Sequence, residues 1–540
     1  MRDGRDGGDA RTVAEALLAD LARRGTRRIW GVPGGGSSLD LIAAMPRFGL
    51  SFVLTRHEGA AGMAAIADAE LTGAPGVFLT TKGPGLGNAL NALACASLER
   101  APVMLVSDGF TPRQLGWVTH QVFDQKQASA AFVAAYARAE GEAPAAEAAA
   151  LLDLAQDRRR AVHLDLTGEA ARRPPGEQRP ARAAAPPMVD PAAALGLLAH
   201  ATRPVLVAGL EAADGIAAAA LRDLAEALGA PVLVTYKAKG VLPDGHALHA
   251  GIFTGGALEG PVMSRADLIV TVGLDPVELI LQPWPYGARV LDVALGGHPV
   301  RYVEPAASLH GPIAHSLAML REAARAGGWT AAEIAGLRDA ALASLAWRGD
   351  GGVAPPAIAG IAQEVAREAG RDPRVTVDAG AHMFSATAFW RCDRPRDLLI
   401  SNGLASMGYA LPAGIAAALH DPARGAVAIT GDGGLMMVAG ELATAAAAKA
   451  RLVTIVLNDG SLSLIDVKQQ QRQLAPEGVR WDRPDFAKVA EGFGVKGFSA
   501  RDPAAYRAAL RAAFAHDGPS LVDVHVEPGG YPAQLQAMRG

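Results

Sequence analysis

The sequence has 540 residues, of which 50% are hydrophobic and 20% are charged, and its net charge is −4. A chain of this length is too long for one hydrophobic core and predicts about three domains. The near-neutral charge provides no basic field for nucleic acid, so we do not expect a nucleic-acid-binding protein.

Several features of the sequence indicate where in the cell the protein is located. The alanine-rich stretches, such as residues 145–152, are interrupted by charges and are shorter than a membrane span. Residues 1–10 are rich in Gly, Asp and Arg and lack the apolar centre of a signal peptide. The two cysteines, Cys95 and Cys392, stand in apolar or mixed surroundings and are expected to be reduced thiols. We therefore expect a cytoplasmic protein that does not bind a membrane.

The first predicted domain covers residues 11–170. Short apolar runs at 28–31, 51–54, 76–80 and 103–106 each lead into a turn with glycine or charged residues, and helical stretches separate them. Strands that alternate with helices are typical of a parallel sheet covered by helices on both faces.

A second predicted domain covers residues 190–330. A linker rich in proline and arginine, residues 172–187, precedes it and is too polar to pack into a core. Apolar runs at 204–209 and 266–273 end in glycine and are typical of buried strands in an α/β layer.

The third predicted domain covers residues 355–530. A mostly helical connector, about 330–350, ends at a joint, 350–352, and a strand at 375–378 then opens the domain. The fold class predicted for the whole chain is α/β, with three doubly wound parallel-sheet domains.

Two acidic triplets in the third domain are the most informative feature. An apolar strand at 426–430 runs into Gly431-Asp432-Gly433, a helix-like segment spans 439–450, and a second apolar run at 452–457 leads into Asn458-Asp459-Gly460. Because the carboxyl ends of parallel strands lie at the same edge of a sheet, both acids are expected beside one ligand site. Two carboxylates and a glycine turn suit a divalent cation that carries a diphosphate.

These triplets resemble the diphosphate-binding motif of thiamine diphosphate (ThDP) enzymes. Further matches follow in the same order as in that family: residues 31–36 resemble its first active-site loop, 56–64 its glutamate-bearing helix, 81–88 its Gly-Pro-Gly turn and 401–412 its methionine motif. The chain therefore resembles the ThDP-dependent acetolactate synthase/2-oxoacid decarboxylase superfamily, and within it the acetolactate synthase-like branch. The resemblance implies the domain order pyrimidine-binding, central, diphosphate-binding.

Glu58 is the main catalytic candidate. By itself, an acid in the first turn of a helix is explained by the helix dipole. Together with the acidic triplets, the surrounding sequence resembles the family helix whose carboxylate bonds the cofactor pyrimidine and favours the tautomer that removes a proton from the thiazolium carbon.

The resemblance implies a full set of site residues. The catalytic residues would be Glu58, His120 and Gln121. The cofactor-binding residues would be Gly34, Gly35, Glu58, Gly83, Asn88, His382, Ala405, Met407, Gly431, Asp432, Gly433, Gly434 and Asp459. Within this set, Met407 would separate the two cofactor rings and the carbonyl of Ala405 would accept a hydrogen bond from the pyrimidine amine. Asp432, Asp459 and the carbonyl of Ser461 would bind Mg²⁺.

The chain also departs from the family pattern. Asp459 stands where many members have asparagine, and Ala381 and Met383 replace the two glutamines of a Gly-Gln-His-Gln segment. His120 replaces a phenylalanine close to the substrate, and Lys468 stands where biosynthetic acetolactate synthases have a tryptophan in the acceptor pocket. Lys468 is either a pocket residue or a solvated helix residue, and the sequence supports both equally.

The implied function is ThDP- and Mg²⁺-dependent decarboxylation of a 2-oxoacid with carboligation. Simple decarboxylation, cleavage of a 2-hydroxyacyl thioester, and a catalytically silent scaffold or regulatory subunit are the alternatives. The loops at 209–212 and 251–256 match the flavin-containing relatives poorly, so we expect no FAD. The resemblance also implies a homodimer or homotetramer with active sites between subunits.

Overall fold

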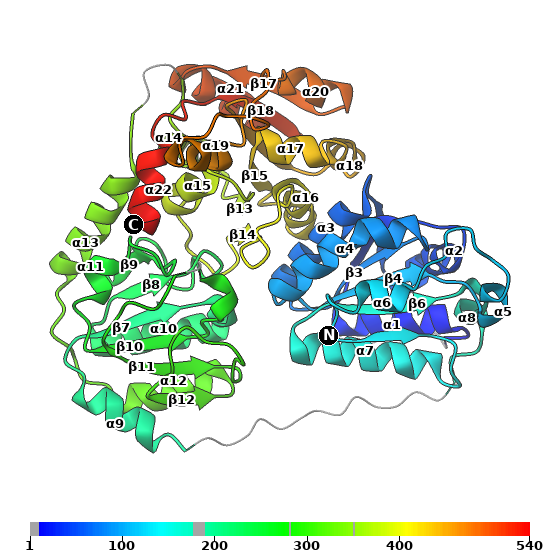
Figure 1. Ribbon diagram of the computed structural model, residues 1–540, viewed down its shortest axis with the longest axis horizontal. Coiled ribbons are helices and arrows are strands. Elements are labelled where there is room, and N and C mark those ends of the chain that lie inside the picture. The colour runs from blue at the N-terminus through cyan, green and yellow to red at the C-terminus, as the bar shows by residue number, and fades with distance from the viewer. Residues whose placement is uncertain (1–9, 177–189, 280–281, 349–351) are drawn as a thin grey trace.

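The computed structural model describes residues 10–176, 190–279, 282–348 and 352–540. Within these residues the strands form three sheets of six parallel strands each, and helices lie on both faces of every sheet (Figure 1). This confirms the predicted fold class. The linker predicted at 172–187 and the joint at 350–352 fall largely outside the described residues. Among the residues described, no helix has both the length and the apolar character that crossing a membrane requires.

The first sheet has the strand order β2-β1-β3-β4-β6-β5. Its strands are β1 (Arg28–Val32), β2 (Ser51–Leu54), β3 (Gly76–Thr80), β4 (Val103–Asp108), β5 (Tyr136–Arg138) and β6 (Val162–Leu166). Its helices are α1 (Val13–Arg24), α2 (Ser37–Ala44), η1 (Met45–Phe48), α3 (Glu58–Thr72), α4 (Pro84–Leu98), α5 (Pro112–Leu115), α6 (Gln125–Ser129), α7 (Pro144–Arg158) and α8 (Gly168–Arg172).

The central sheet has the order β12-β11-β10-β7-β8-β9. Its strands are β7 (Pro204–Ala208), β8 (Val232–Val234), β9 (His249–Ile252), β10 (Leu268–Val272), β11 (Arg289–Ala294) and β12 (Ala307–His310). The helices here are α9 (Ala192–His200), η2 (Leu210–Ala212), α10 (Gly215–Leu228), α11 (Gly260–Met263), η3 (Pro276–Glu278) and α12 (Ile313–Glu322), and α13 (Ala331–Leu345) is the helical connector.

The third sheet has the order β14-β13-β15-β16-β18-β17. Its strands are β13 (Arg374–Val377), β14 (Leu398–Ile400), β15 (Ala426–Gly431), β16 (Leu452–Asn458), β17 (Lys496–Ala500) and β18 (Ser520–His525). Its helices are α14 (Pro355–Glu368), α15 (His382–Phe389), α16 (Ala410–His420), α17 (Asp432–Val438), α18 (Glu441–Ala447), α19 (Ser463–Gln471), α20 (Phe486–Gly492), α21 (Pro503–Ala515) and α22 (Tyr531–Arg539).

The helical segment between the two acidic triplets differs from the prediction. Instead of one helix over 439–450, α17 begins at Asp432 and α18 follows after a break at Gly440. A side chain at Gly440 would lie 3.3 Å from Cβ of Arg56 in the first domain, and the Arg56 amide donates to Glu441 at 2.9 Å. The break therefore coincides with a contact between two domains, which the local sequence pattern does not encode.

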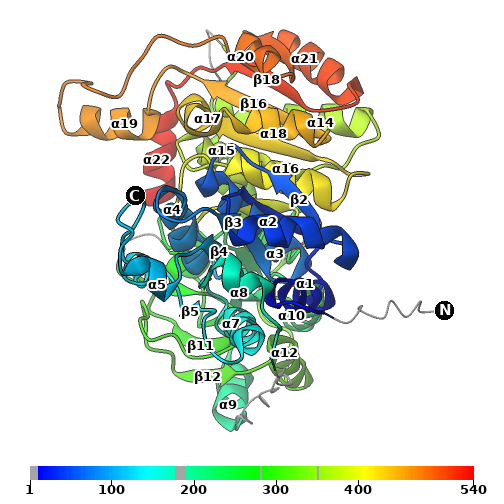
Figure 2. The same ribbon diagram turned by 90° about the vertical axis from the view of Figure 1, so that its right-hand side faces the viewer.

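The first and third domains share one apolar core. Helix α3 packs against α16, so that residues such as Ile66 and Ile415 belong to the same buried cluster (Figures 1 and 2). Both helices are rich in alanine and glycine. Small side chains permit this close approach, and burial of the apolar faces stabilises the two domains as one body.

Candidate functional site

A cavity of about 300 Å³ lies beside the carboxyl ends of β13, β15 and β16, which are inner strands of the third sheet. Helix α22 and the central-domain residues Tyr236 and Thr254 complete its walls. The predicted site residues that line it are His382, Ala405, Met407, Gly431, Asp432, Gly433, Gly434, Asp459 and Ser461. The structure thus brings together the half of the predicted site that lies in the third domain.

Asp432 and Asp459 follow neighbouring strands and share this cavity. Asp432 accepts hydrogen bonds from the amides of Gly433 at 2.8 Å and Gly460 at 2.7 Å, while Asp459 accepts from the Ser463 hydroxyl at 2.6 Å. Burial, together with the nearby charge of Asp459, raises the pKa of Asp432 to about 7, and burial also raises the pKa of Asp459. Two neighbouring carboxylates that repel each other, here the buried Asp432 and the half-buried Asp459, are stabilised by a bound divalent cation.

His382 begins α15 and faces the same cavity. Glycines leave room for its ring, because a Cβ at Gly380 would lie 2.8 Å from the ring and one at Gly431 would lie 3.1 Å from it. Its Nε2 is buried without a hydrogen-bond partner among the described residues, and burial lowers the pKa of the imidazole to about 4. The free Nε2 can donate a hydrogen bond to a phosphate oxygen when it carries the ring proton, or when the negative charge of a phosphate favours the protonated ring.

The loop that carries Ala405 and Met407 has an unusual backbone. Ala405 adopts φ 53°, the left-handed region that costs a residue with a side chain about 1–2 kcal/mol. Such backbone conformations persist where surrounding contacts enforce them, often at ligand sites. Here the strained residue lines the cavity.

Asp378, which directly follows β13, supports this site from behind the cavity, and the sequence analysis missed it. It accepts hydrogen bonds from the amides of Gly408 at 3.0 Å and Tyr409 at 3.1 Å and from the Thr430 hydroxyl at 2.8 Å. Burial raises its pKa to about 6. Asp378 therefore joins the loop behind Met407 to the end of β15. Its position after a buried strand next to β15 was the available signal.

The predicted residues of the first domain do not line this cavity. Glu58 is buried at the start of α3 and accepts a hydrogen bond from Asn88 at 3.0 Å. Gly83 precedes α4 with φ 66°, and a Cβ there would lie 2.7 Å from the carbonyl of Gln121. Glu58, Gly83, Asn88 and Gln121 thus form a second group, separate from the acidic pair within one chain.

The loop with Gly34 and Gly35 is held by Asp108, a second residue that the sequence analysis missed. Asp108 ends β4 and accepts from the Ser37 hydroxyl at 2.7 Å and the Ser38 amide at 3.0 Å. A Cβ at Gly34 would come within 2.1 Å of its carboxylate, so the loop requires glycine there.

His120 lies on an exposed segment between α5 and α6. Gln121 has φ 59°, and the neighbouring Trp117 and Phe123 are 72% and 43% exposed. Neither His120 nor Gln121 contributes to the cavity of the third domain. Large apolar side chains exposed in this manner are typical of surfaces that another protein surface covers.

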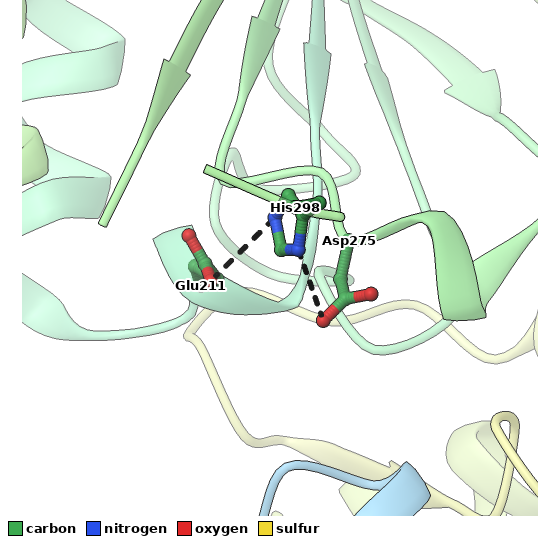
Figure 3. A group of neighbouring side chains, drawn as sticks. All are labelled: Glu211, Asp275 and His298. Atoms are coloured by element: carbon green, nitrogen blue, oxygen red, sulfur yellow. Dashed lines mark ion pairs between the residues drawn. The ribbon is translucent and has the colours of Figure 1, made fainter. Parts of the chain in front are cut away.

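A further group of ionisable residues lies at the carboxyl edge of the central sheet. Glu211, Asp275 and His298 come from loops after β7, β10 and β11, and the His298 ring is 3.9 Å from each carboxylate (Figure 3). Both carboxylate oxygens of Asp275 accept hydrogen bonds from Arg100 of the first domain. Because the guanidinium already balances Asp275, this group is explained as an ion-pair contact between domains.

Comparison with known proteins places the chain among ThDP enzymes. Residues 11–128 match the N-terminal TPP binding domain of thiamine pyrophosphate enzymes, residues 191–318 their central domain, and residues 378–524 their C-terminal TPP binding domain. TPP, thiamine pyrophosphate, is another name for ThDP.

Curated relatives match along nearly the whole chain. The probable 2-ketoarginine decarboxylase AruI of Pseudomonas aeruginosa is 30% identical, over 95% of this chain and 94% of its own length. An acetolactate synthase of Bacillus subtilis is 28% identical, over 95% and 93% respectively.

A solved structure shows the same fold. The thiamine diphosphate-dependent 4-hydroxybenzoylformate decarboxylase of Rhodococcus jostii RHA1 has a TM-score of 0.81 and 22% identity, covering 96% of this chain and 99% of that one. From the three domain matches and the full-length relatives we conclude that the chain belongs to the ThDP-dependent, acetolactate synthase-like enzyme family.

Proposed function

We propose that this enzyme uses ThDP and Mg²⁺ to decarboxylate a 2-oxoacid and joins the remaining fragment to a second carbonyl compound. The observation that carries the proposal is the acidic pair Asp432, which is buried, and Asp459, which is half-buried, in one cavity with His382, whose Nε2 has no hydrogen-bond partner among the described residues. A cation site next to a phosphate donor suits a metal-bound diphosphate. A cytoplasmic location, expected from composition, remains part of the proposal.

The residues present fit the cofactor. Asp432, Asp459 and the carbonyl of Ser461 would hold the cation, and His382 would donate to the diphosphate. Gly431 leaves space for this approach, since a side chain there would press on the His382 ring. Met407 and the strained Ala405 line the same cavity and would contact the rings.

When bound, ThDP supplies a nucleophilic carbon and an electron sink for the electrons left by carbon dioxide. The chain's part is positioning and proton transfer. Glu58 would hold a proton against the pyrimidine nitrogen, and Asn88, which donates to its carboxylate at 3.0 Å, would keep it oriented. Apolar side chains of α19, Leu464 and Ile465, line the cavity and would limit the entry of water.

We further propose that the active site forms between two subunits of a homodimer or homotetramer. The group around Glu58 and the cavity around Asp432 lie in different places within one chain. Exposed apolar side chains accompany both, including Trp117 in the first domain and Met437, which is 61% exposed, in α17. Contact between subunits would bury these side chains and complete the site.

The reaction type is tested by product analysis. Purified enzyme with ThDP and Mg²⁺ should release carbon dioxide from one or more members of a panel of 2-oxoacids. When an aldehyde or a second 2-oxoacid is present, hydroxyketone products should appear. No carbon dioxide from any 2-oxoacid, although ThDP binds, would refute the proposal.

Simple decarboxylation is the second candidate. Lys468, at the position of the family's acceptor-pocket tryptophan, is exposed on α19 and does not line the cavity. Lys468 therefore supplies no wall for the second carbonyl compound in the part of the site that one chain forms. Release of the aldehyde as the sole product, with all acceptors tested, would support this candidate over carboligation.

If the contact between subunits makes both Lys468 and His120 face the pocket, we expect them to favour polar or anionic 2-oxoacids. Lys468 follows the cavity-lining Leu464 by one helical turn, which puts both on one face of α19. The double variant Lys468→Trp, His120→Phe should shift kcat/KM towards pyruvate by about 10-fold, a size typical of one altered pocket contact. The comparison requires the parent and both single variants on pyruvate and on polar 2-oxoacids. An unchanged preference would make Lys468 a solvated helix residue.

We expect activity without bound flavin. The loops after β7 and β9 resemble the flavin-binding relatives poorly, and Arg100 already pairs with Asp275 at the carboxyl edge of the central sheet. The absorbance spectrum of the purified protein, followed by assay before and after added FAD, checks this. If the protein contained flavin in a one-to-one ratio and lost its activity without it, the prediction would be wrong.

A further inference from the structure

The three domains meet at a buried lysine, Lys237, which follows β8 in the central domain. Its side chain is 2% exposed. The ammonium group donates to Glu70 and, at 2.7 Å, to Glu99, both in the first domain. It also donates to the carbonyl of Ile400 in the third domain at 3.3 Å. One charged group thus bonds to residues from both other domains, close to β14, where the domains converge in Figure 1.

Glu99 follows α4 and is buried with its side chain fully enclosed. One oxygen faces Lys237, and the other accepts hydrogen bonds from the loop that leads to the cavity. The donors are the Ser401 hydroxyl at 2.9 Å and the amides of Gly403 at 2.9 Å and Leu404 at 3.3 Å. A first-domain carboxylate therefore fixes the backbone immediately before Ala405.

The Ser406 amide donates to the Ser401 hydroxyl within the loop at 3.1 Å, and two further contacts of the loop come from other domains. Asn91 of α4 donates to Ser406 at 2.8 Å, and Asn402 donates to the carbonyl of Glu278 in the central domain at 3.0 Å. A Cβ at Gly403 would lie 2.4 Å from the carbonyl of Leu98, so the loop lies tightly against the end of α4. The left-handed Ala405 is thus enforced mainly from outside its own domain.

The charges of the junction are balanced only while Lys237 is present. Burial alone would lower the pKa of Lys237, but the charges of Glu70 and Glu99 outweigh it and raise that pKa above its ordinary value. Arg396 is 3.8 Å from Glu70 but is not paired with Glu99 in the described part of the chain. Without Lys237, Glu99 would be a buried carboxylate whose charge lacks a partner, which is strongly unfavourable. It would then draw in water or shift, and the loop bonded to it would lose its anchor.

We propose that Lys237 and Glu99 are positioning residues that hold the 401–407 loop, and so Ala405 and Met407, in the conformation that receives ThDP. This inference rests on the proposed function, in which Ala405 and Met407 contact the cofactor. It assigns a role in cofactor binding to a lysine of the central domain that does not line the cavity.

Lys239 provides a matched control. It is also a buried lysine with a 2% exposed side chain, and it lies in the same segment. Its ammonium pairs with Asp244 at 2.7 Å, and Asp244 accepts from the amide of Cys392 at 3.0 Å. This pair likewise joins the central and third domains, but it has no bond to the 401–407 loop.

The test compares Lys237→Met with Lys239→Met in the full chain. Thermal unfolding without cofactor reports the general cost of removing a buried lysine. Calorimetric titration with ThDP at saturating Mg²⁺ measures the ThDP affinity, which depends on the conformation of the loop. We expect both variants to lower the Tm, but Lys237→Met alone to weaken ThDP binding by about 10-fold or more, within the range of coupling between contacting groups. The KM for ThDP should rise by a similar factor, with a smaller change in kcat at saturating ThDP.

Ser401→Ala is the milder variant in case Lys237→Met does not fold. It removes one donor to Glu99 and the acceptor of the Ser406 amide, two bonds that hold the loop, and should weaken ThDP binding by about 3-fold with little change in Tm. Unchanged ThDP affinity in Ser401→Ala and in any folded Lys237→Met would overturn the inference, as would an equal loss of affinity in Lys239→Met. A wild-type protein that does not bind ThDP would instead refute the proposed function.

Discussion

Glu58→Gln is expected to lower the rate of carbon dioxide release by about 10²–10⁴-fold, the usual contribution of a general acid–base group. Glutamine keeps the size of the side chain and can still accept the hydrogen bond that Asn88 donates at 3.0 Å. It cannot hold the proton shared with the pyrimidine. The fold and ThDP affinity should therefore remain close to wild type, as measured by circular dichroism and calorimetry. Near-normal turnover with ThDP bound would remove Glu58 from the mechanism.

Mixing variants tests whether the site lies between subunits. At ThDP and Mg²⁺ concentrations that just saturate the wild type, Glu58→Gln chains and Asp432→Ala chains are each expected to be almost inactive. In a mixed dimer, one site would combine an intact Glu58 from one chain with an intact Asp432 from the other, and the second site would carry both changes. Random reassembly should restore about a quarter of the wild-type activity, because half of the dimers are mixed and each has one intact site. No recovery, with subunit exchange verified by differently tagged chains, would show that each chain supplies its own Glu58.

Asp432→Ala is expected to weaken cofactor binding more than chemistry. Asp432 accepts from the amides of Gly433 and Gly460 and shares its cavity with Asp459, so its removal would delete a cation ligand and loosen the turn after β16. We expect ThDP affinity to fall by about 100-fold or more, at least as much as the loss usual for residues that only support metal ligands. Excess Mg²⁺ and ThDP should restore part of the activity. Calorimetry across a series of Mg²⁺ concentrations measures both effects.

Asp459 supplies a pair of comparison variants. Asp459→Ala should weaken ThDP binding in the same way as Asp432→Ala. Asp459→Asn keeps an oxygen ligand and removes a negative charge that would lie near the diphosphate, so it should retain most of the affinity. Equal and unchanged affinities in Asp432→Ala and Asp459→Ala would contradict the metal site.

The sequence by itself determined the fold class and one half of the site. Apolar runs that end in glycine or aspartate predicted the parallel strands, and the structure forms three such sheets. Because the carboxyl ends of neighbouring parallel strands meet at one edge, the order of β15 and β16 was enough to bring Asp432 and Asp459 into one cavity. These are consequences of local patterns and of a regular topology.

The tertiary structure alone decided how the domains hold the site. It separates Glu58 from the acidic cavity within one chain and gives Ala405 its left-handed backbone. It also adds the helix α17 from Asp432 to Val438 and starts the helix predicted over 439–450 only after Gly440. Lys237 reaches Glu99 across 138 positions and Ile400 across 163. Periodicity and motifs record which residues are buried, but the choice of partner for a buried charge depends on packing between distant segments. For that reason the sequence predicted residues that line the cavity, and only the structure revealed the charged residues that bond to the loop beside it.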